Sequence, residues 1–113
     1  MKKTREINLT DRDQGIVAKI KKAICEILPD AEIILFGSRA RGNPEDDSDW
    51  DILVLTEQVT DEVRDMLYDI IYDIDLAENV VITPLILPKD EWEFKRYKDH
   101  PLHRNVDAEG VVL

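Results

Sequence analysis

Apolar residues recur at helical spacing in two stretches of the chain. In the first stretch the apolar positions are Ile16, Val17, Ile20, Ile24, Ile27 and Leu28. Their spacing predicts an amphipathic helix that is capped by Thr10 and ends at Pro29. A second helix is predicted from Thr60 onward, with its apolar face formed by Val63, Leu67, Ile70, Ile71 and Ile74.

Three short apolar runs have the composition of buried strands. They cover residues 31–36, 50–55 and 80–87. The third run contains Pro84, which has no backbone N–H, so this strand is expected at a sheet edge or at a bulge. Residues 38–41, after the first strand, are expected to form a short helical turn.

The C-terminal part of the chain is predicted to be mostly helical. Residues 89–100 have a helical pattern, and a short helix is expected to start at Pro101 and end at Gly110. The alternation of helices and strands predicts an α/β (α+β) fold, in which helices pack on a small mixed sheet of three to four strands. We interpret residues 1–113 as a single domain.

Composition and charge narrow the classes of function. The chain is 43% hydrophobic, yet it lacks the run of about 20 apolar residues that spans a bilayer. Its N-terminal residues have no apolar secretory segment, and its single cysteine, Cys25, cannot form an internal disulfide. We interpret Cys25 as a buried structural thiol. Together these features predict a cytoplasmic protein without a membrane partner.

The chain is acidic, with a formal net charge of −10. This charge repels nucleic-acid backbones, and the sequence has no stripe of lysines and arginines, so nucleic-acid binding is disfavoured. An acidic surface is suited to a basic protein partner. It also keeps a protein in solution, and the sequence leaves both interpretations open.

Gly37 and Ser38 follow directly after the first predicted strand. A glycine lets the backbone bend sharply there and approach a ligand closely. The following N–H groups, together with the Ser38 hydroxyl, then offer hydrogen-bond donors to an anion such as a polyphosphate. Taken alone, a Gly-Ser pair after a strand more often marks an ordinary turn.

Asp49 and Asp51 lie at the start of the second predicted strand. On a strand these two residues share one face, with Cα atoms ~6.5–7 Å apart. Their carboxylates repel each other unless a cation lies between them, and oxygen ligands select Mg²⁺ or Mn²⁺. Trp50 points to the opposite face and is expected in the core. The alternative is that both aspartates only begin a strand at a solvated rim.

Together, residues 37–51 resemble the signature of the DNA polymerase β-like nucleotidyltransferases, and specifically of their minimal stand-alone members. That signature is Gly-Ser, ten residues, then Asp-x-Asp, and the flanking runs "ILF" and "ILVL" are similar too. The resemblance implies the nucleotidyltransferase fold, with Gly37 and Ser38 holding the β- and γ-phosphates and Asp49 and Asp51 binding Mg²⁺. It also implies transfer of a nucleoside monophosphate, with ATP as the expected donor, to a hydroxyl acceptor.

Active members of this family carry a third carboxylate on the strand after the second long helix, within a pattern close to Val-Asp-Ile-Ser-Pro. Here the matching residues are Val80-Val81-Ile82-Thr83-Pro84, so Val81 stands where the aspartate is expected. Asp73, Asp75 and Glu78 lie just upstream and are expected to belong to a helix end and a solvated turn; the alternative is that one of them is a substitute, with Asp75 as our first choice. A slow enzyme, a carboxylate supplied by a partner and an inactive remnant all remain open.

Two arginines follow Ser38, and aromatic residues and histidines lie near the C-terminus. We expect Arg39 to pair with the acidic residues 45–47, while Arg41 is either a triphosphate ligand or a partner of the same acids. The aromatic residues Trp92, Phe94 and Tyr97 are expected in the core. The separation of Cys25 from His100 and His103 disfavours a zinc site.

Two functions remain. The first is a metal-dependent nucleotidyltransferase; the resemblance implies that it acts as an antitoxin on a helical toxin of the HEPN type and modifies a tyrosine of that partner. The second is a weakened or inactive family member that binds a nucleotide or a partner protein, motivated by Val81 and by the net charge. Size and charge disfavour a nucleic-acid polymerase or a tRNA-end enzyme.

Overall fold

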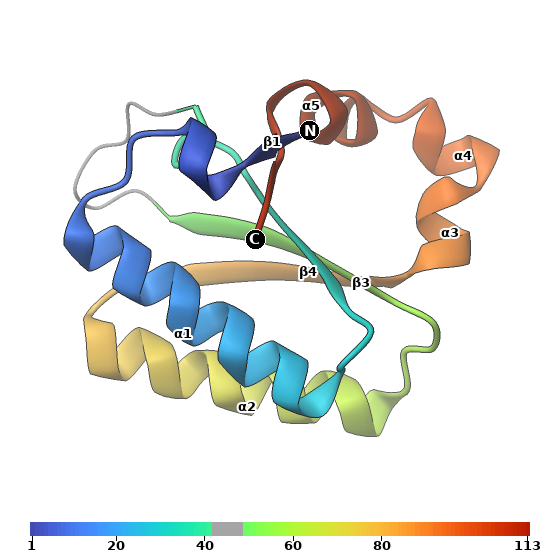
Figure 1. The fold of residues 1–113 in the computed structure, drawn as a ribbon. Helices are drawn as coiled ribbons and strands as arrows, with labels where there is room; N and C mark the ends of the chain where they lie inside the picture. Colours follow the sequence, from blue (N-terminus) through green and yellow to red (C-terminus); the bar gives the residue numbers. More distant parts are fainter. Residues whose placement is uncertain (42–48) are drawn as a thin grey trace.

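The computed structural model describes residues 1–41 and 49–113. Five strands form one mixed sheet in the order β1-β5-β2-β3-β4 (Figure 1). The strands are β1 (Lys2–Lys3), β2 (Glu32–Phe36), β3 (Trp50–Thr56), β4 (Ile82–Pro88) and β5 (Val111–Val112). The helices are the 3-10 helix η1 (Thr4–Glu6), α1 (Asp11–Ile27), α2 (Asp61–Glu78), α3 (Lys89–Glu93), α4 (Lys95–Lys98) and α5 (Pro101–Glu109).

The strand directions bring three chain segments to one end of the sheet. β2 is antiparallel to β3, and β3 is parallel to β4. The end of β2 therefore meets the starts of β3 and β4. β4 is the outermost strand on its side, which confirms the edge position expected from Pro84.

The mixed sheet with packed helices confirms the predicted fold class, although it has five strands rather than three or four. The additional strands are β1 and β5, which are two residues long each. So short a strand has no hydrophobic periodicity to detect. β5 pairs with β2 on one side and with β1 on the other.

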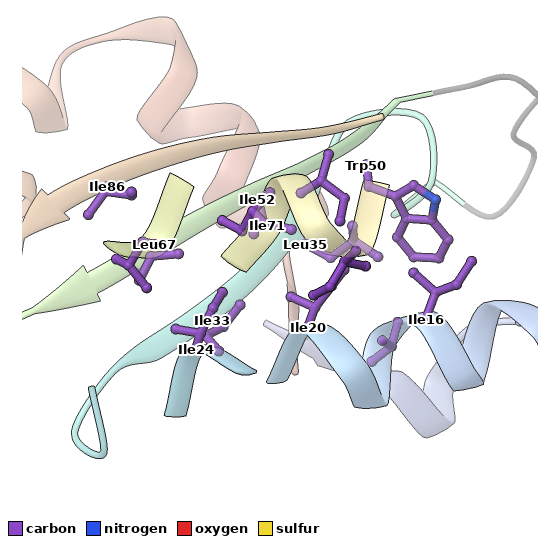
Figure 2. Packing of buried hydrophobic residues seen from close by; sticks show 14 of the residues in the cluster. Ile16, Ile20, Ile24, Ile33, Leu35, Trp50, Ile52, Leu67, Ile71 and Ile86 are labelled. Carbon is purple, nitrogen blue, oxygen red and sulfur yellow. The ribbon is translucent and has the colours of Figure 1, made fainter. Parts of the chain in front are cut away.

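Helices α1 and α2 lie side by side on one face of the sheet, over the larger core cluster (Figure 1). The predicted caps are confirmed, since the side chains of Thr10 and Thr60 accept hydrogen bonds from the backbone N–H groups of Asp13 and Val63. Figure 2 shows the core residues of both helices and of the inner strands, with Trp50 near Ile16. Trp50 is completely buried, as predicted.

A smaller cluster on the other face packs against the C-terminal helices. It contains Ile34, Leu53, Leu55, Leu87, Trp92 and Val106. The single helix predicted for residues 89–100 is wrong, because Phe94 adopts extended backbone angles, φ −68° and ψ 144°, between α3 and α4. Phe94 is 62% exposed, so its predicted core position is also wrong, whereas Trp92 is buried and stacks on His103.

The outer edge of β4 is closed by side chains of α2. The carboxylate of Asp75 accepts a hydrogen bond from the backbone N–H of Ile82 at 3.0 Å, and Arg64 donates one to the carbonyl of Ile86 at 3.3 Å. Pro84 has no N–H to offer a further strand. These features protect the edge from pairing with another strand. In the described part of the chain, no helix is both long and apolar enough to cross a membrane.

Candidate functional site

The structure brings Gly37 into direct contact with Asp51. The register pairs Phe36 with Asp51, so the residue after β2 lies against the Asp51 side chain. Gly37 has φ +77°, and a Cβ atom added to it would lie 2.3 Å from Oδ2 of Asp51. Both the backbone angle and the available space therefore require glycine. The backbone N–H groups of Ala40 and Arg41 donate to the carbonyl of Gly37, so Ser38 lies within the expected turn.

Replacing Gly37 by alanine is expected to lower the free energy of unfolding by about 2 kcal/mol, because the new Cβ is strained and displaces the Asp51 carboxylate. Gly15 is a matched control, since it lies in α1 with no neighbouring atom within 4 Å of an added Cβ. Gly15→Ala is expected to stabilise the protein by about 0.5–1 kcal/mol. Urea denaturation of both variants measures these effects. A stable Gly37→Ala protein contradicts the described contact.

Asp49 and Asp51 lie at the start of β3, with Asp49 exposed and Asp51 half-buried. Burial raises the pKa of the Asp51 carboxyl above its ordinary value of 3.8, the nearby charge of Asp49 raises this pKa further, and Arg41 lowers it. Ionisation of the Asp51 carboxyl therefore carries a cost that a divalent cation would offset. The two oxygen donors fit Mg²⁺ or Mn²⁺. Within residues 1–41 and 49–113, no third histidine, cysteine, aspartate or glutamate joins them.

Val81 lies beside the aspartates. The parallel register pairs Asp51 with Thr83, and the backbone N–H of Trp50 donates to the carbonyl of Val81 at 2.8 Å. Because side chains alternate along each strand, Val81 shares the face of the sheet that carries Asp49 and Asp51. Its side chain is 56% exposed. This position is therefore geometrically suited to a third carboxylate, although the sequence places valine there.

Asp75 occupies a different environment from the one a third metal ligand requires. It belongs to α2, which covers the Trp50 face of the sheet, and its carboxylate accepts the Ile82 N–H. Burial raises the pKa of the Asp75 carboxyl, while this hydrogen bond lowers it. The interaction fixes the start of β4 against α2. We therefore assign Asp75 a structural role instead of the substitute role considered from the sequence.

Arg41 lies close enough to Asp51 to influence it electrostatically, because its charge lowers the pKa of that carboxyl. The guanidinium also forms an ion pair with Glu109 of α5, at 3.2 Å. This pair is exposed and therefore weak, so Arg41 can exchange Glu109 for another anion. The acidic residues 45–47 are the expected partners of Arg39 and one of two alternatives for Arg41, and they lie outside the described residues.

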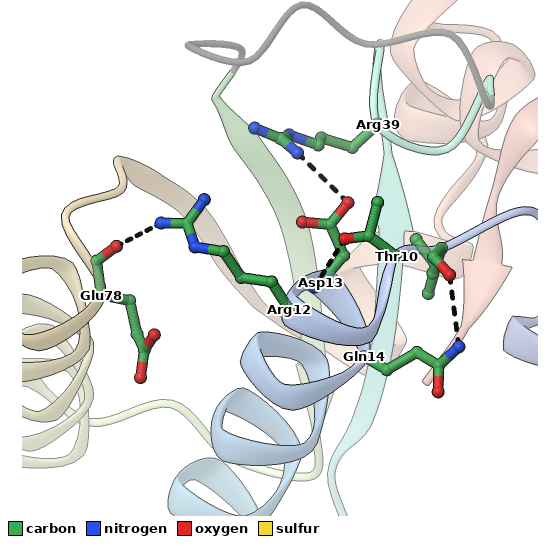
Figure 3. Close-up of polar contacts among 7 residues, drawn as sticks. Thr10, Arg12, Asp13, Gln14, Arg39 and Glu78 are labelled. Atoms are coloured by element: carbon green, nitrogen blue, oxygen red, sulfur yellow. Dashed lines mark hydrogen bonds and ion pairs between the residues drawn. The ribbon is translucent and has the colours of Figure 1, made fainter.

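Arg39 makes a buried contact that the sequence did not predict. Its side chain is 5% exposed and forms an ion pair with Asp13 of α1, at 3.5 Å between Nη1 and Oδ2 (Figure 3). Its guanidinium also lies 4.7 Å above the ring of Trp50, at cation–π distance. The contact joins α1, the turn after Gly37 and the start of β3. In the sequence, only the presence of Asp13 pointed to this contact. An acidic residue is common in the first turn of a helix, so Asp13 did not indicate a partner elsewhere in the chain.

Asp13→Asn is expected to lower the free energy of unfolding by about 2 kcal/mol, since it leaves a buried guanidinium without its carboxylate. The matched control is Glu109→Gln, which breaks the exposed pair with Arg41 and is expected to cost less than about 1 kcal/mol. Thermal and urea denaturation at low and at high salt measure both costs. Equal losses in the two variants contradict the structural role of the Asp13–Arg39 pair.

Comparisons with known proteins find similar sequences and similar folds. The model of the nucleotidyltransferase domain family matches residues 17–109, which include every residue of the candidate site. A candidate protein adenylyltransferase of Methanocaldococcus jannaschii is 35% identical over 77 residues, which cover 66% of this chain and 78% of that protein.

Two solved structures share the fold. A candidate minimal nucleotidyltransferase superposes with a TM-score of 0.60 at 18% identity, over 92% of this chain and 97% of that one. A mutant of the toxin–antitoxin pair MntA–HpeT contains a chain that superposes with a TM-score of 0.59 at 22% identity, over 82% of this chain and 68% of that one. At these identities the likeness concerns the fold.

Proposed function

Because the chain belongs to the nucleotidyltransferase domain family, we propose that it transfers AMP from ATP to a hydroxyl group, with Mg²⁺ or Mn²⁺ as the cofactor. The observation that carries this proposal is the contact between Gly37 and Asp51. This contact supports the proposal, because a strand-end turn suited to phosphates then lies against one carboxylate of a pair suited to a divalent cation. A turn that only connects two strands needs no such contact.

Each site residue has a proposed role. Gly37 and Ser38 hold the β- and γ-phosphates through backbone N–H groups and the serine hydroxyl. Asp49 and Asp51 would hold the cation, which when bound would neutralise charge on the phosphates and on the departing pyrophosphate. Arg41 releases Glu109 and binds the triphosphate. The acceptor hydroxyl loses its proton to water and attacks the α-phosphorus, while the bond between the α-phosphorus and the oxygen that bridges to the β-phosphate breaks and pyrophosphate leaves.

The proposed acceptor is a hydroxyl on a partner protein. The name of the Methanocaldococcus jannaschii relative, which describes protein adenylylation, supports a protein acceptor. The toxin–antitoxin pair among the structural neighbours supports a toxin as that partner. By resemblance to the minimal nucleotidyltransferases, we propose a helical toxin of the HEPN type.

A second candidate function is binding without transfer, and Val81 favours it. With valine beside the aspartates, residues 1–41 and 49–113 offer no third carboxylate at the site that could accept the proton of the attacking hydroxyl. General-base assistance is typically worth about 10²–10⁴-fold in rate. In this case the protein would bind a nucleotide, or neutralise a basic partner by contact alone.

Incubation with ATP labelled at the α-phosphate, and in parallel at the γ-phosphate, tests the proposal. The reactions contain Mg²⁺ or EDTA, and the protein encoded by the adjoining reading frame is present or absent. We expect Mg²⁺-dependent transfer of the α-label only, together with release of pyrophosphate. If ATP binds with Mg²⁺ but no label is transferred to any protein, the second candidate function is correct. Transfer of the γ-label contradicts both.

A further inference from the structure

Three exposed apolar side chains form a stripe along α2. Tyr68, Tyr72 and Leu76 are 45%, 60% and 66% exposed. They are spaced four residues apart, so they lie on one side of the helix. Single exposed apolar residues are common on protein surfaces, whereas a continuous stripe indicates an interaction site.

The stripe borders a groove between α2 and the edge strand β4, with a volume of about 380 Å³. We call it the α2–β4 groove. It is lined by the apolar or aromatic residues Tyr68, Tyr72, Ile82 and Pro84 and by the acidic residues Asp69 and Asp75. An apolar lining with carboxylates at its border is suited to a ligand that combines apolar and cationic groups.

The helix beside the groove is strongly acidic. α2 contains a single basic residue, Arg64, and its guanidinium donates to the β4 backbone. The acidic residues of α2 are Asp61, Glu62, Asp65, Asp69, Asp73, Asp75 and Glu78. Much of the formal charge of −10 is therefore concentrated on the helix that carries the apolar stripe.

This charge distribution selects among the classes of occupant. A second copy of the chain would bring two acidic α2 helices together, and like charges at an interface are costly. An anionic membrane or a nucleic acid would meet the same repulsion. A peptide that adds to the sheet as a strand finds the β4 edge closed by Asp75, Arg64 and Pro84.

We propose that the α2–β4 groove is the docking site for an amphipathic helix of a partner protein, in which lysines and arginines flank an apolar stripe. The apolar side chains of that helix pack between Tyr68 and Tyr72, and its cations pair with Asp65 and Asp69. Docking of this kind uses side-chain contacts and leaves the β4 edge intact. The inference concerns the partner of either candidate function, and it does not depend on nucleotidyl transfer.

Titration of the full ¹⁵N-labelled chain with synthetic helical peptides tests this proposal without any nucleotide. The first peptide carries a leucine stripe flanked by lysines; the second replaces its lysines by glutamates, and the third replaces its leucines by serines. We expect the leucine–lysine peptide to shift the amide signals of residues 68–76, 82 and 83. Its affinity should exceed that of each other peptide at least tenfold.

Matched variants separate the groove from the general acidity of the chain. Tyr72→Ser is expected to weaken binding about tenfold, whereas Met66→Ser changes an exposed apolar residue on another side of α2 and should have no effect. Asp69→Asn is expected to weaken binding more than Glu26→Gln, which removes the same charge from an exposed position on α1.

Several outcomes would overturn the proposal. Equal losses in Tyr72→Ser and Met66→Ser, or amide shifts outside the groove, would place binding elsewhere. Equal affinity for the leucine–glutamate peptide would show that charge does not select the occupant. If the amide signal of Tyr72 is lost in the absence of any peptide and sedimentation detects dimers, a second copy of the chain is the occupant. Groove-specific binding to vesicles of anionic phospholipid would identify a membrane.

Discussion

Asp51→Asn is expected to lower the rate of AMP transfer about 10³-fold and, at neutral pH, to raise the free energy of unfolding. The loss of activity follows from the removal of one of the two charged oxygen ligands proposed for the cation. The gain in stability follows from burial, which together with the charge of Asp49 raises the pKa of the Asp51 carboxyl. An uncharged asparagine meets neither cost. The opposite signs of the two effects identify a residue kept for function at the expense of stability.

The pH dependence of this gain follows from proton linkage. Because the pKa of Asp51 is higher in the folded protein than its ordinary value of 3.8, the folded chain binds this proton more tightly than the unfolded chain. The favourable contribution of Asp51 to stability is therefore fully present below pH 3.8, and it is lost as the pH rises through the raised pKa. The difference in the free energy of unfolding between Asp51→Asn and the unmodified protein should grow as the pH rises from 3.8 through the raised pKa of Asp51. At higher pH this difference should stay constant.

Urea denaturation across this pH range measures the difference, with Asp73→Asn as the control for loss of an exposed aspartate on α2. Mg²⁺ is expected to raise the melting temperatures of the unmodified chain and of Asp73→Asn. It should raise the melting temperature of Asp51→Asn much less. An Asp51→Asn protein that is destabilised at neutral pH would show that the carboxylate is held by favourable contacts instead. An Asp51→Asn protein with full transfer activity would remove Asp51 from the proposed site.

The two segments that meet at Gly37 and Asp51 each have a local signal in the sequence, although the contact between them was not predicted. The apolar runs marked β2 and β3, the glycine marked the end of β2, and the aspartates marked the start of β3. The antiparallel pairing of these two strands has no such local signal. The structure supplies that pairing, and with it the close approach of Gly37 to the Asp51 side chain.

The features that the sequence missed depend on contacts between distant residues. The Asp13–Arg39 pair joins the start of α1 to the turn after β2, and neither residue has a neighbour in sequence that indicates the other. Phe94 interrupts a segment in which every residue is compatible with a helix. The position of this break is therefore set by tertiary packing and not by local helix propensity. The α2–β4 groove likewise requires the position of the edge strand beside the helix, which periodicity within α2 does not give.

Val81→Asp is expected to raise the rate of AMP transfer about 10²-fold, since it places a third carboxylate on the face of the sheet that carries Asp49 and Asp51. The change leaves the hydrogen bond from the backbone N–H of Trp50 to the backbone carbonyl of residue 81 intact. Because the Val81 side chain is exposed, there is room for a carboxylate at this position. Without a cation, three neighbouring carboxylates repel one another, so the variant should also be less stable than the unmodified chain in EDTA. Mg²⁺ should reverse this loss, because the affinity of a cation site rises with the charge of its ligands.

Val81→Asn is the matched control, because it has the size and polarity of the aspartate without the charge. Measuring initial rates of α-label transfer for both variants, over a range of Mg²⁺ concentrations, separates the effect of charge from that of shape. We expect the aspartate alone to increase the rate and to lower the Mg²⁺ concentration needed for half the maximal rate. If both variants match the unmodified chain in rate and in Mg²⁺ dependence, position 81 is not the place of a third ligand. If a partner protein supplies the third carboxylate instead, transfer by the unmodified chain should depend on that partner.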